Sequence, residues 1–300
     1  MVDSQRGEAA VKQDRDGAGP SGHILDIGLK VDDERIIRRD RQGSQEEQVK
    51  HPCFSKRSPS VLPMTSEVVV GVLALQGAFR EHVALFRKLG VKSIEVRTEE
   101  DLQRCDGLVF PGGESTAMGI ISQSGDGKML EALRAWAKTR PSWGVCAGLI
   151  LLADTVEGQK QGGQTLIGGL HVAVTRNMFG SQIASFEADV TFGPPAAPLI
   201  GDTRPFHALF IRAPGINAVS DDVSVICELP DPSGAKIVGV RQVRNPGPTI
   251  YLLASVSPHR FEELMSQGHI MGTSFHPELT EDTRFHEAFV KLIAETQKCA

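Results

Sequence analysis

The spacing of apolar side chains divides the chain into alternating strands and helices from about residue 67 onward. Apolar runs of strand length occupy Val68–Leu75 and Gly107–Phe110, with a further short run at Ser93–Arg97. Phe79–Leu89 and Lys128–Lys138 carry apolar residues at helical spacing, and a glycine or a proline soon follows each. Short strands that alternate with helices predict an α/β fold with a mostly parallel central sheet flanked by helices.

The second half of the chain changes to a β-rich pattern. It follows a strand at Trp143–Cys146 and the start of a helix at Leu149–Ala153. A last strand, Ile270–Phe275, precedes an amphipathic helix over Arg284–Glu295. We therefore expect an additional antiparallel or mixed β-rich part beside the parallel sheet. The strands predicted for this part are Leu170–Thr175, Phe186–Val190, Ala208–Arg212, Val223–Glu228 and Ile237–Gln242.

Residues 1–66 differ from the remainder of the chain. They are rich in charged residues, Gln, Gly and Ser, and their only apolar patch is near Ile24–Leu29. Such a segment buries too little apolar surface to offset the entropy of ordering it. We expect a disordered extension over 1–66, followed by one domain over 67–300.

Charge and cysteine usage narrow the range of partners and cofactors. The net charge of −5 does not favour nucleic acid or an anionic membrane surface, and no apolar run is long enough to span a bilayer. The five cysteines form no C-x-x-C pair and do not cluster with histidines as metal ligands would. We expect reduced thiols, a cytoplasmic location, and no metal or other cofactor.

Cys146 lies in Gly144-Val145-Cys146-Ala147-Gly148, where an apolar strand meets an apolar helix. This is the G-x-nucleophile-x-G pattern of a sharp strand-to-helix turn, which has no room for side chains at the glycine positions. The turn also directs backbone N–H groups and the helix dipole at the thiol, and both favour the thiolate. A small buried core residue is the alternative, because that is the usual role of a lone cysteine.

His276 and Glu278 stand two positions apart near the C-terminus. Residues i and i+2 of an extended segment face the same way, so Glu278 is placed to orient the imidazole of His276. A lone histidine near a strand end is more often structural, but the glycine-flanked cysteine favours a Cys146–His276–Glu278 site.

Two further features can bind or polarise a substrate. The double glycine in Pro111–Thr116 follows a predicted strand and lets backbone approach a ligand, so Gly113 and Ala147 are candidate oxyanion-hole donors. A plain glycine-rich turn is the alternative, and a P-loop is excluded because no G-K-[ST] follows. Arg176 and Arg212 end predicted strands and could hold a carboxylate, although either one alone could be a surface charge.

These motifs together resemble the glutaminase subunit of pyridoxal 5′-phosphate synthase, a family of class I (triad) glutamine amidotransferases. The resemblance covers about 67–243 and 269–293, and it implies a class I glutamine amidotransferase-like, flavodoxin-like fold. Its motifs are Gly71–Gly77, Pro111–Thr116, Gly144–Ile150, Arg176-Asn177 with Phe179-Gly180, Ser185–Glu187, Phe210–Pro214 and Ser274–Thr280.

The resemblance implies hydrolysis of L-glutamine to L-glutamate and ammonia, with Cys146 as nucleophile, His276 as base and Glu278 as its orienter. The ammonia passes to a synthase subunit that makes pyridoxal 5′-phosphate, in an assembly of twelve synthase and twelve glutaminase subunits. The residues expected to hold glutamine are Gly113, Glu114, Ser115, Arg176, Ile211 and Arg212.

The chain departs from the family in a few places. Val145 stands where Thr is usual, and Ser181 stands where a basic residue is usual. About 243–267 forms an insert before the last strand, either a genuine loop or a retained piece of non-coding sequence, and it enters close to the triad. Three alternatives follow: a non-catalytic binding subunit, a partner-independent hydrolase such as a γ-glutamyl hydrolase, and a glutaminase that feeds another amidotransferase pathway.

Overall fold

In the computed structural model, the described residues are 68–158, 163–179, 185–242 and 269–299. All described residues belong to one compact unit within Pro59–Ala300. The predicted disordered extension over 1–66 lies outside the described residues and stays a prediction.

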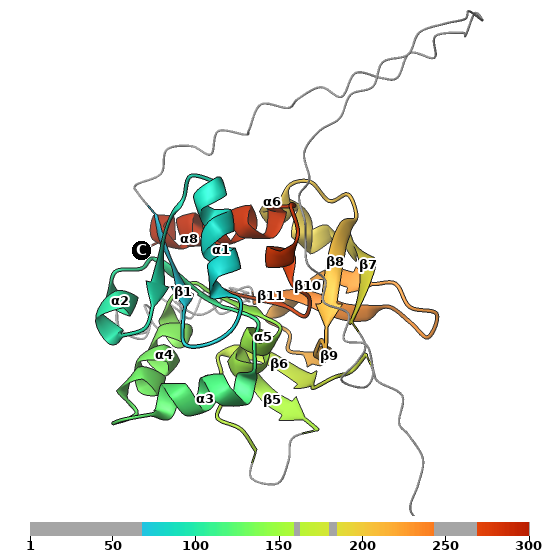
Figure 1. The fold of residues 1–300 in the computed structure, drawn as a ribbon. Helices are drawn as coiled ribbons and strands as arrows, with labels where there is room; N and C mark the ends of the chain where they lie inside the picture. Colours follow the sequence, from blue (N-terminus) through green and yellow to red (C-terminus); the bar gives the residue numbers. More distant parts are fainter. Residues whose placement is uncertain (1–67, 159–162, 180–184, 243–268, 300) are drawn as a thin grey trace, which may run out of the picture. The chain divides into compact units, whose positions relative to one another are not determined.

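Strands and helices alternate through the first half of the described chain (Figure 1). The strands are β1 (Val69–Leu73), β2 (Lys92–Val96), β3 (Gly107–Phe110), β4 (Ser142–Val145), β5 (Ala153–Glu157), β6 (Leu170–Thr175), β7 (Ser185–Phe192), β8 (Phe206–Ile211), β9 (Gly215–Val219), β10 (Val223–Leu229), β11 (Lys236–Gln242) and β12 (Ile270–Thr273). The helices are α1 (Phe79–Lys88), α2 (Glu99–Gln103), α3 (Ser115–Gln123), α4 (Lys128–Thr139), α5 (Ala147–Leu152), α6 (Ala197–Ile200) and α8 (Arg284–Cys299), with 3₁₀ turns η1 (Pro194–Ala196) and η4 (Pro277–Leu279).

The sheet begins with parallel strands in the order β2-β1-β3-β4-β12. The register places Trp143 of β4 between Val109 of β3 and Met271 of β12. The carboxyl ends of β3, β4 and β12 therefore meet at one edge of the sheet, where open α/β sheets bind their ligands. The predicted parallel sheet flanked by helices is confirmed.

Both faces of this parallel part are covered, which explains why its strands read as continuous apolar runs. On one face, Phe86 of α1 and Phe289 of α8 share a buried cluster with Trp143. On the other face, Met118 of α3 and Leu133 of α4 share a second cluster with residues of α5. Figure 1 shows α1 and α8 on the opposite side of the sheet from α3, α4 and α5.

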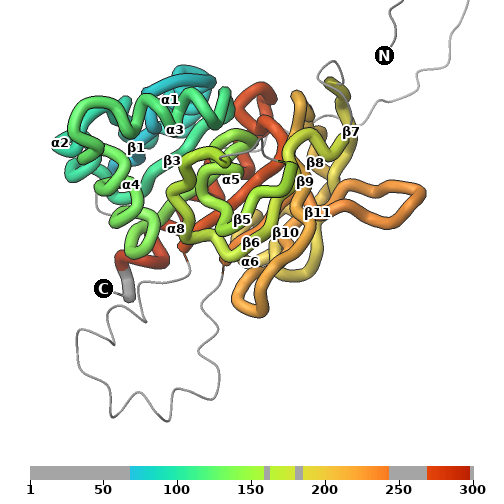
Figure 2. The backbone as a smooth tube through the Cα atoms, turned by 90° about the horizontal axis from the view of Figure 1, so that it is seen from below, coloured from blue at the N-terminus to red at the C-terminus, as the bar shows by residue number. Residues whose placement is uncertain are grey.

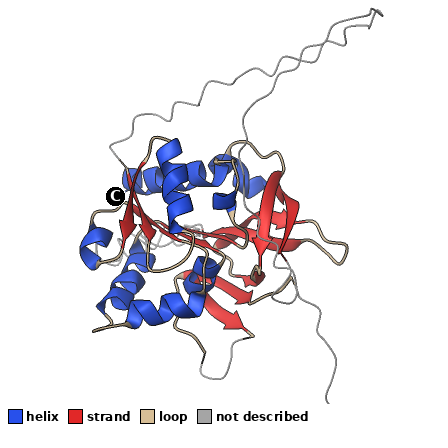
Figure 3. Ribbon diagram, viewed as in Figure 1, coloured by secondary structure: helices blue, strands red, loops and turns tan. Residues whose placement is uncertain are grey.

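Beyond β12 the sheet continues with antiparallel strands in the order β11-β10-β7-β8 (Figures 2 and 3). A branch leaves this path at β11, where β9 pairs with β11 and β6, and β6 pairs in parallel with β5. The predicted mixed β-rich part is thus confirmed, although β5 and β9 were not among the predicted strands.

Three boundaries near the candidate site differ from the sequence prediction. Cys146 is not the last strand residue but stands between β4 and α5. The last parallel strand ends at Thr273 rather than at Phe275. Ala153, which was assigned to the helix, begins β5 instead. In each case the buried segment continues past the end of its element, so the pattern of the side chains gave no boundary.

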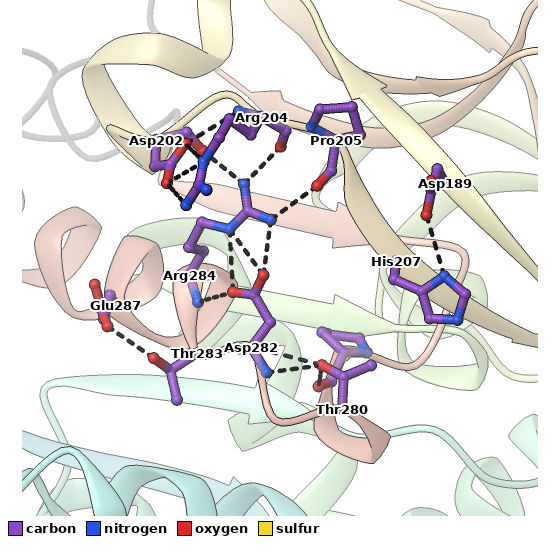
Figure 4. A network of polar contacts seen from close by, with 11 residues as sticks. Asp189, Asp202, Arg204, Pro205, His207, Thr280, Asp282, Thr283, Arg284 and Glu287 are labelled. Carbon is purple, nitrogen blue, oxygen red and sulfur yellow. Dashed lines mark hydrogen bonds and ion pairs between the residues drawn. The ribbon is translucent and has the colours of Figure 1, made fainter. Parts of the chain in front are cut away.

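Arg284 fixes the segment between η4 and α8 (Figure 4). Its guanidinium donates to the carbonyl groups of Asp202 at 2.8 Å, Arg204 at 2.6 Å and Pro205 at 3.1 Å, and it also donates to the carboxylate of Asp282. These bonds attach the start of α8 to the loop that leads into β8. Because Asp282 and Arg284 follow η4 closely in the chain, these bonds also restrain η4, which carries Glu278.

The predicted insert at about 243–267 lies outside the described residues. The strands on either side of it are described. β11 and β12 pair antiparallel, with Arg241 opposite Met271 and Val240 opposite Gly272. The chain therefore leaves the sheet and returns to it on neighbouring strands.

Candidate active site

Cys146 stands at a strained turn between β4 and α5. Its φ of 49° and ψ of −99° define a conformation that residues other than glycine rarely adopt. Its N–H donates to the Thr273 carbonyl at 2.8 Å, and its carbonyl accepts from the Ile150 N–H at 3.2 Å. These two bonds hold the turn, which places the thiol at the carboxyl edge of the sheet.

The glycines on either side of Cys146 are sterically required. A Cβ at Gly148 would lie 1.9 Å from the carbonyl oxygen of Phe110, and a Cβ at Gly144 would lie 2.7 Å from the carbonyl group of Gly148. Neither approach is possible without moving backbone. The predicted reason for the glycine spacing is therefore found in the structure.

His276 and Glu278 reach the thiol from the segment that follows β12. The N–H of His276 donates to the Leu209 carbonyl at 2.9 Å, so β8 fixes the backbone there. His276 Nδ1 lies 2.7 Å from Oε1 of Glu278, and the same imidazole interacts with the side chain of Cys146. The structure brings Cys146, His276 and Glu278 together.

The reason for the His276–Glu278 contact differs from the one that the sequence suggested. The two residues do not share an extended segment, because Pro277–Leu279 forms the 3₁₀ turn η4. Proline fits the first position of such a turn, where it has no N–H to satisfy. The turn of η4, rather than strand alternation, directs the carboxylate to the imidazole.

The electrostatics of the site favour a charged imidazole. Burial lowers the pKa of His276, but the hydrogen bonds and charges of Cys146 and Glu278 outweigh it and raise the pKa to about 10. The imidazole is therefore protonated at neutral pH. It stabilises negative charge on the sulfur and holds the proton that an amide leaving group needs.

Cys105 and Cys227 are poor nucleophiles. Cys105, Cys146 and Cys227 are all free thiols. Burial and nearby carboxylates raise the pKa of Cys105 to about 12, and burial also raises the pKa of Cys227. A thiol with a raised pKa is rarely ionised at neutral pH, so neither competes with Cys146.

The loop after β3 packs directly on His276. A Cβ at Gly112 would lie 2.4 Å from Cε1 and 2.8 Å from Nδ1 of His276, so only glycine fits there. Gly113, the candidate oxyanion donor, follows it beside Gln76, whose Oε1 accepts from the N–H of Glu114 at 2.8 Å. The loop is thus held from the β1 side as well as from the triad side.

Ala147, Ile211 and Arg212 also border the nucleophile. Ala147 begins α5, so its N–H is one of the first-turn groups that have no acceptor within the helix. The carbonyl oxygen of Ile211 lies 3.9 Å from Sγ of Cys146. Arg212 follows β8 with a φ of 48°, so the predicted strand ends one residue early and the chain turns there.

Glu114 caps the N-terminus of α3. Its carboxylate accepts from the N–H groups of Thr116 at 3.0 Å and Ala117 at 2.6 Å, and it lies 3.5 Å from the guanidinium of Arg176. Partial burial raises the pKa of Glu114, but these hydrogen bonds and Arg176 outweigh it and lower the pKa. Glu114 is therefore a carboxylate at neutral pH.

A residue that sequence reasoning missed joins the other predicted substrate-binding side chains. Oε1 of Gln164 accepts from Arg176 Nη1 at 2.7 Å and from Ser115 Oγ at 3.0 Å. Ser115, Arg176 and Glu114 thus form one polar group beside the glycine loop. Gln164 lies in a short glycine- and glutamine-rich run that carries no pattern, so nothing in the sequence pointed to it.

The described residues offer neither a metal site nor a membrane-spanning helix. Among the described residues, no group of three or more His, Cys, Asp or Glu side chains could hold a metal ion. Within that part of the chain, no helix combines the length and the apolar character needed to cross a membrane.

The chain is similar to a defined family of proteins. The model of the SNO glutamine amidotransferase family matches residues 72–264. A protein of Arabidopsis thaliana described as "probable pyridoxal 5′-phosphate synthase subunit PDX2" is 42% identical over 234 residues, which cover 78% of this chain and 89% of that protein. The "pyridoxal 5′-phosphate synthase subunit PdxT" of Chloroflexus aurantiacus is 40% identical over 75% of this chain and 100% of its own length.

The chain is also similar to proteins of known structure. A crystal structure of a glutamine amidotransferase is 34% identical, covers 75% of this chain and 98% of its own, and superposes with a TM-score of 0.58. PurLQS of Thermotoga maritima, 15% identical with a TM-score of 0.51 over 77% of this chain and 100% of its own, shares the fold.

Proposed function

The chain belongs to the SNO glutamine amidotransferase family, and we propose that Cys146, His276 and Glu278 are the residues with which it hydrolyses L-glutamine. It acts as the glutaminase subunit of pyridoxal 5′-phosphate synthase and supplies ammonia for the synthesis of vitamin B6. One observation supports the assignment of the residues: the imidazole that interacts with the thiol of a strained elbow has its Nδ1 2.7 Å from a buried carboxylate.

The reaction proceeds through a thioester. The Cys146 sulfur attacks the side-chain amide carbon of glutamine, and His276 gives its proton to the leaving nitrogen, which departs as ammonia. His276, now neutral, takes a proton from water, whose oxygen attacks the thioester carbon. Glutamate leaves, and the proton on His276 restores the resting pair. Glu278 keeps the imidazole in its productive orientation throughout.

The negative charge of the tetrahedral intermediate needs two donors. The N–H groups of Gly113, on the loop after β3, and of Ala147, at the start of α5, are the donors that we propose. Each such donor is worth about 3 kcal/mol of transition-state stabilisation. The Gly112 carbonyl already accepts from the Ala78 N–H at 2.9 Å, so the Gly112–Gly113 peptide has a partner that docking of a synthase subunit could exchange.

The α-ammonium and α-carboxylate groups of glutamine match the charges of Glu114, Arg176 and Arg212. Arg176 and Arg212 suit the α-carboxylate, because a guanidinium binds a carboxylate through two parallel hydrogen bonds. The ionised Glu114 suits the α-ammonium group. Ser115 and the backbone of Ile211 complete the set, and Gln164 positions Arg176 and Ser115 within it.

The partner of this reaction is the synthase subunit. We expect the assembly to contain twelve synthase subunits, each carrying one glutaminase. Ammonia must pass between the subunits by a protected route, because protonation in water removes its nucleophilicity. Light scattering of the reconstituted complex checks the stoichiometry: a mass that corresponds to twelve plus twelve subunits is expected, and a different ratio contradicts it.

Ammonia release from glutamine, measured with and without the synthase subunit, tests the proposed function. The parent chain is expected to turn over at least tenfold faster with its partner, a barrier difference of about 1.4 kcal/mol. Cys146→Ala should abolish hydrolysis and still bind the partner, whereas Cys105→Ala, the same change at a cysteine with a raised pKa, should leave hydrolysis intact.

Three results contradict this proposal. Substantial hydrolysis by Cys146→Ala would show that Cys146 is not the nucleophile. Equal turnover with and without a saturating partner indicates a partner-independent hydrolase. No hydrolysis by the parent chain in the complex indicates a non-catalytic subunit.

A further inference from the structure

A buried pair of histidines lies behind the triad. His82 of α1 and His286 of α8 are both 0% exposed, and His82 Nδ1 lies 3.0 Å from His286 Nε2. The Trp143 ring packs edge-to-face with both imidazoles, with ring centroids 5.4 Å and 5.1 Å away. The pair therefore lies in a fully buried layer between α1, α8 and the parallel sheet.

This pair faces the free oxygen of Glu278. Oε1 of Glu278 is engaged by His276, whereas Oε2 is buried, has no hydrogen bond among the described residues, and lies 3.7 Å from Nε2 of His82. His82 Nε2 likewise has no hydrogen bond there. Two unsatisfied buried polar atoms are costly. At 3.7 Å they stand just beyond hydrogen-bonding range and need only a small shift to form a bond.

The pair can supply that bond in only one protonation pattern. Burial lowers the pKa of both His82 and His286, so each ring is neutral at pH 7 and carries one proton. If His82 carried its proton on Nδ1, the bare lone pair of Nε2 would face the Glu278 carboxylate. If His286 donates from Nε2 to Nδ1 of His82, the proton of His82 stands on Nε2 and points at Oε2. Electrostatics selects the second pattern.

We propose that His82 is a positioning residue for the triad, with its Nε2–H holding Oε2 of Glu278 while His286 fixes the tautomer of His82. Glu278 is thereby held at both oxygens, so Oε1 cannot rotate away from His276 during turnover. The inference rests on the proposed function of the triad and adds a residue from α1 that no motif indicated.

Two substitutions of His82 separate positioning from packing. His82→Leu removes the donor, and kcat for glutamine hydrolysis in the complex is expected to fall about ten- to hundredfold, the effect of losing a hydrogen bond to a charged group. KM should stay within about twofold, because His82 does not touch glutamine. His82→Gln places an amide N–H near the position of Nε2 and should restore most of kcat.

Leu133→Ala is the matched control for lost stability. Leu133 is fully buried in α4 on the other face of the sheet, so its variant should lower the melting temperature and leave kcat unchanged. If His82→Leu keeps the parent kcat while Cys146→Ala is inactive, the positioning role is overturned and the proposed function stands. If His82→Gln is as impaired as His82→Leu, packing rather than donation explains the loss.

A second measurement uses the parent chain and therefore does not depend on the folding of a variant. Nitrogen chemical shifts of ¹⁵N-histidine in the full parent chain distinguish the two tautomers of a neutral imidazole. The proposal expects His82 and His286 to carry their protons on Nε2. A proton on Nδ1 of His82 overturns it.

Discussion

At the scale of single residues, glycines decide where the triad side chains can stand. Gly144 and Gly148 were recognisable from the sequence, because the elbow pattern includes them. Gly112 was not, since its role depends on His276, which is 164 positions further along the chain. The sequence motif selected Gly113 of the same pair, and only the packing of the imidazole shows what Gly112 does.

Gly112→Ala is expected to lower kcat for glutamine hydrolysis about a hundredfold with little change in melting temperature. The added Cβ would meet His276 Cε1 at 2.4 Å, so the ring must move, and a displacement of this kind costs about that much. Gly193→Ala is the matched control, because its Cβ meets nothing nearer than 3.5 Å. Parent-like kcat for Gly112→Ala would show that the ring has room to adjust.

The same residue scale shows why part of the site was predictable and part was not. Cys146, His276 and Glu278 stand in short local patterns, and the structure brings them together. His82 and His286 pair across 204 positions, and Gln164 reaches Ser115 across 49. A single sequence holds no record of such pairs, because each residue alone looks like an ordinary helix or loop position.

At the scale of elements, the apolar runs predicted most strands but not their ends. Leu170–Thr175 coincides with β6, because alternation is regular there and turns flank it. β9 was missed because Gly215–Val219 is short, begins with glycine and contains an exposed Asn217. The segment after Thr273 stays buried through Phe275, but the strand has already ended, and Pro277 begins a 3₁₀ turn.

The packing of α1 against α8 makes stability depend on pH. Burial lowers the pKa of His82, and it lowers that of His286 to about 3, so below pH 6.5 the unfolded chain binds more protons than the folded one. The free energy of unfolding should therefore fall as the pH drops below 6.5, by up to about 1.4 kcal/mol per pH unit for each histidine. Above pH 6.5 both rings are neutral in either state and contribute no slope.

Denaturant titrations of His286→Gln between pH 6.5 and pH 5 check this expectation. The variant should lose stability less steeply than the parent chain. The control is His207→Gln: hydrogen bonds to Glu187 and Asp189 raise the pKa of His207, so removing it should not flatten the slope. Equal slopes for the parent chain and His286→Gln would mean that His286 is not kept neutral by the fold.

The connection between β11 and β12 permits a second experiment at this scale. Because Arg241 and Met271 are opposite each other, deletion of 244–267 should leave the fold intact. Each doubling of loop length costs only about 0.6 kcal/mol, so stability should change little. His276 lies at the far end of β12 from this connection, and glutaminase activity should be equal or higher. Loss of soluble protein would show that the segment belongs to the core.

At the scale of the whole molecule, the parallel part and the antiparallel part contribute different halves of the site. The turns after β3 and β4 supply the glycine loop and Cys146, whereas β8 holds the backbone of His276 and carries Ile211. The division into a parallel sheet and a β-rich part could be predicted from the sequence. The order in which β12 joins them could not, because strand order depends on long-range pairing rather than on local pattern.

Formation of pyridoxal 5′-phosphate by the reconstituted complex tests most directly whether this chain supplies ammonia through Cys146. The synthase subunit is given its other substrates together with either glutamine or an ammonium salt. With glutamine, the parent chain should support product formation and Cys146→Ala should not. With the ammonium salt, both should support it equally, because the nitrogen source no longer requires hydrolysis. Glutamine-dependent product at the parent rate with Cys146→Ala would contradict the assignment.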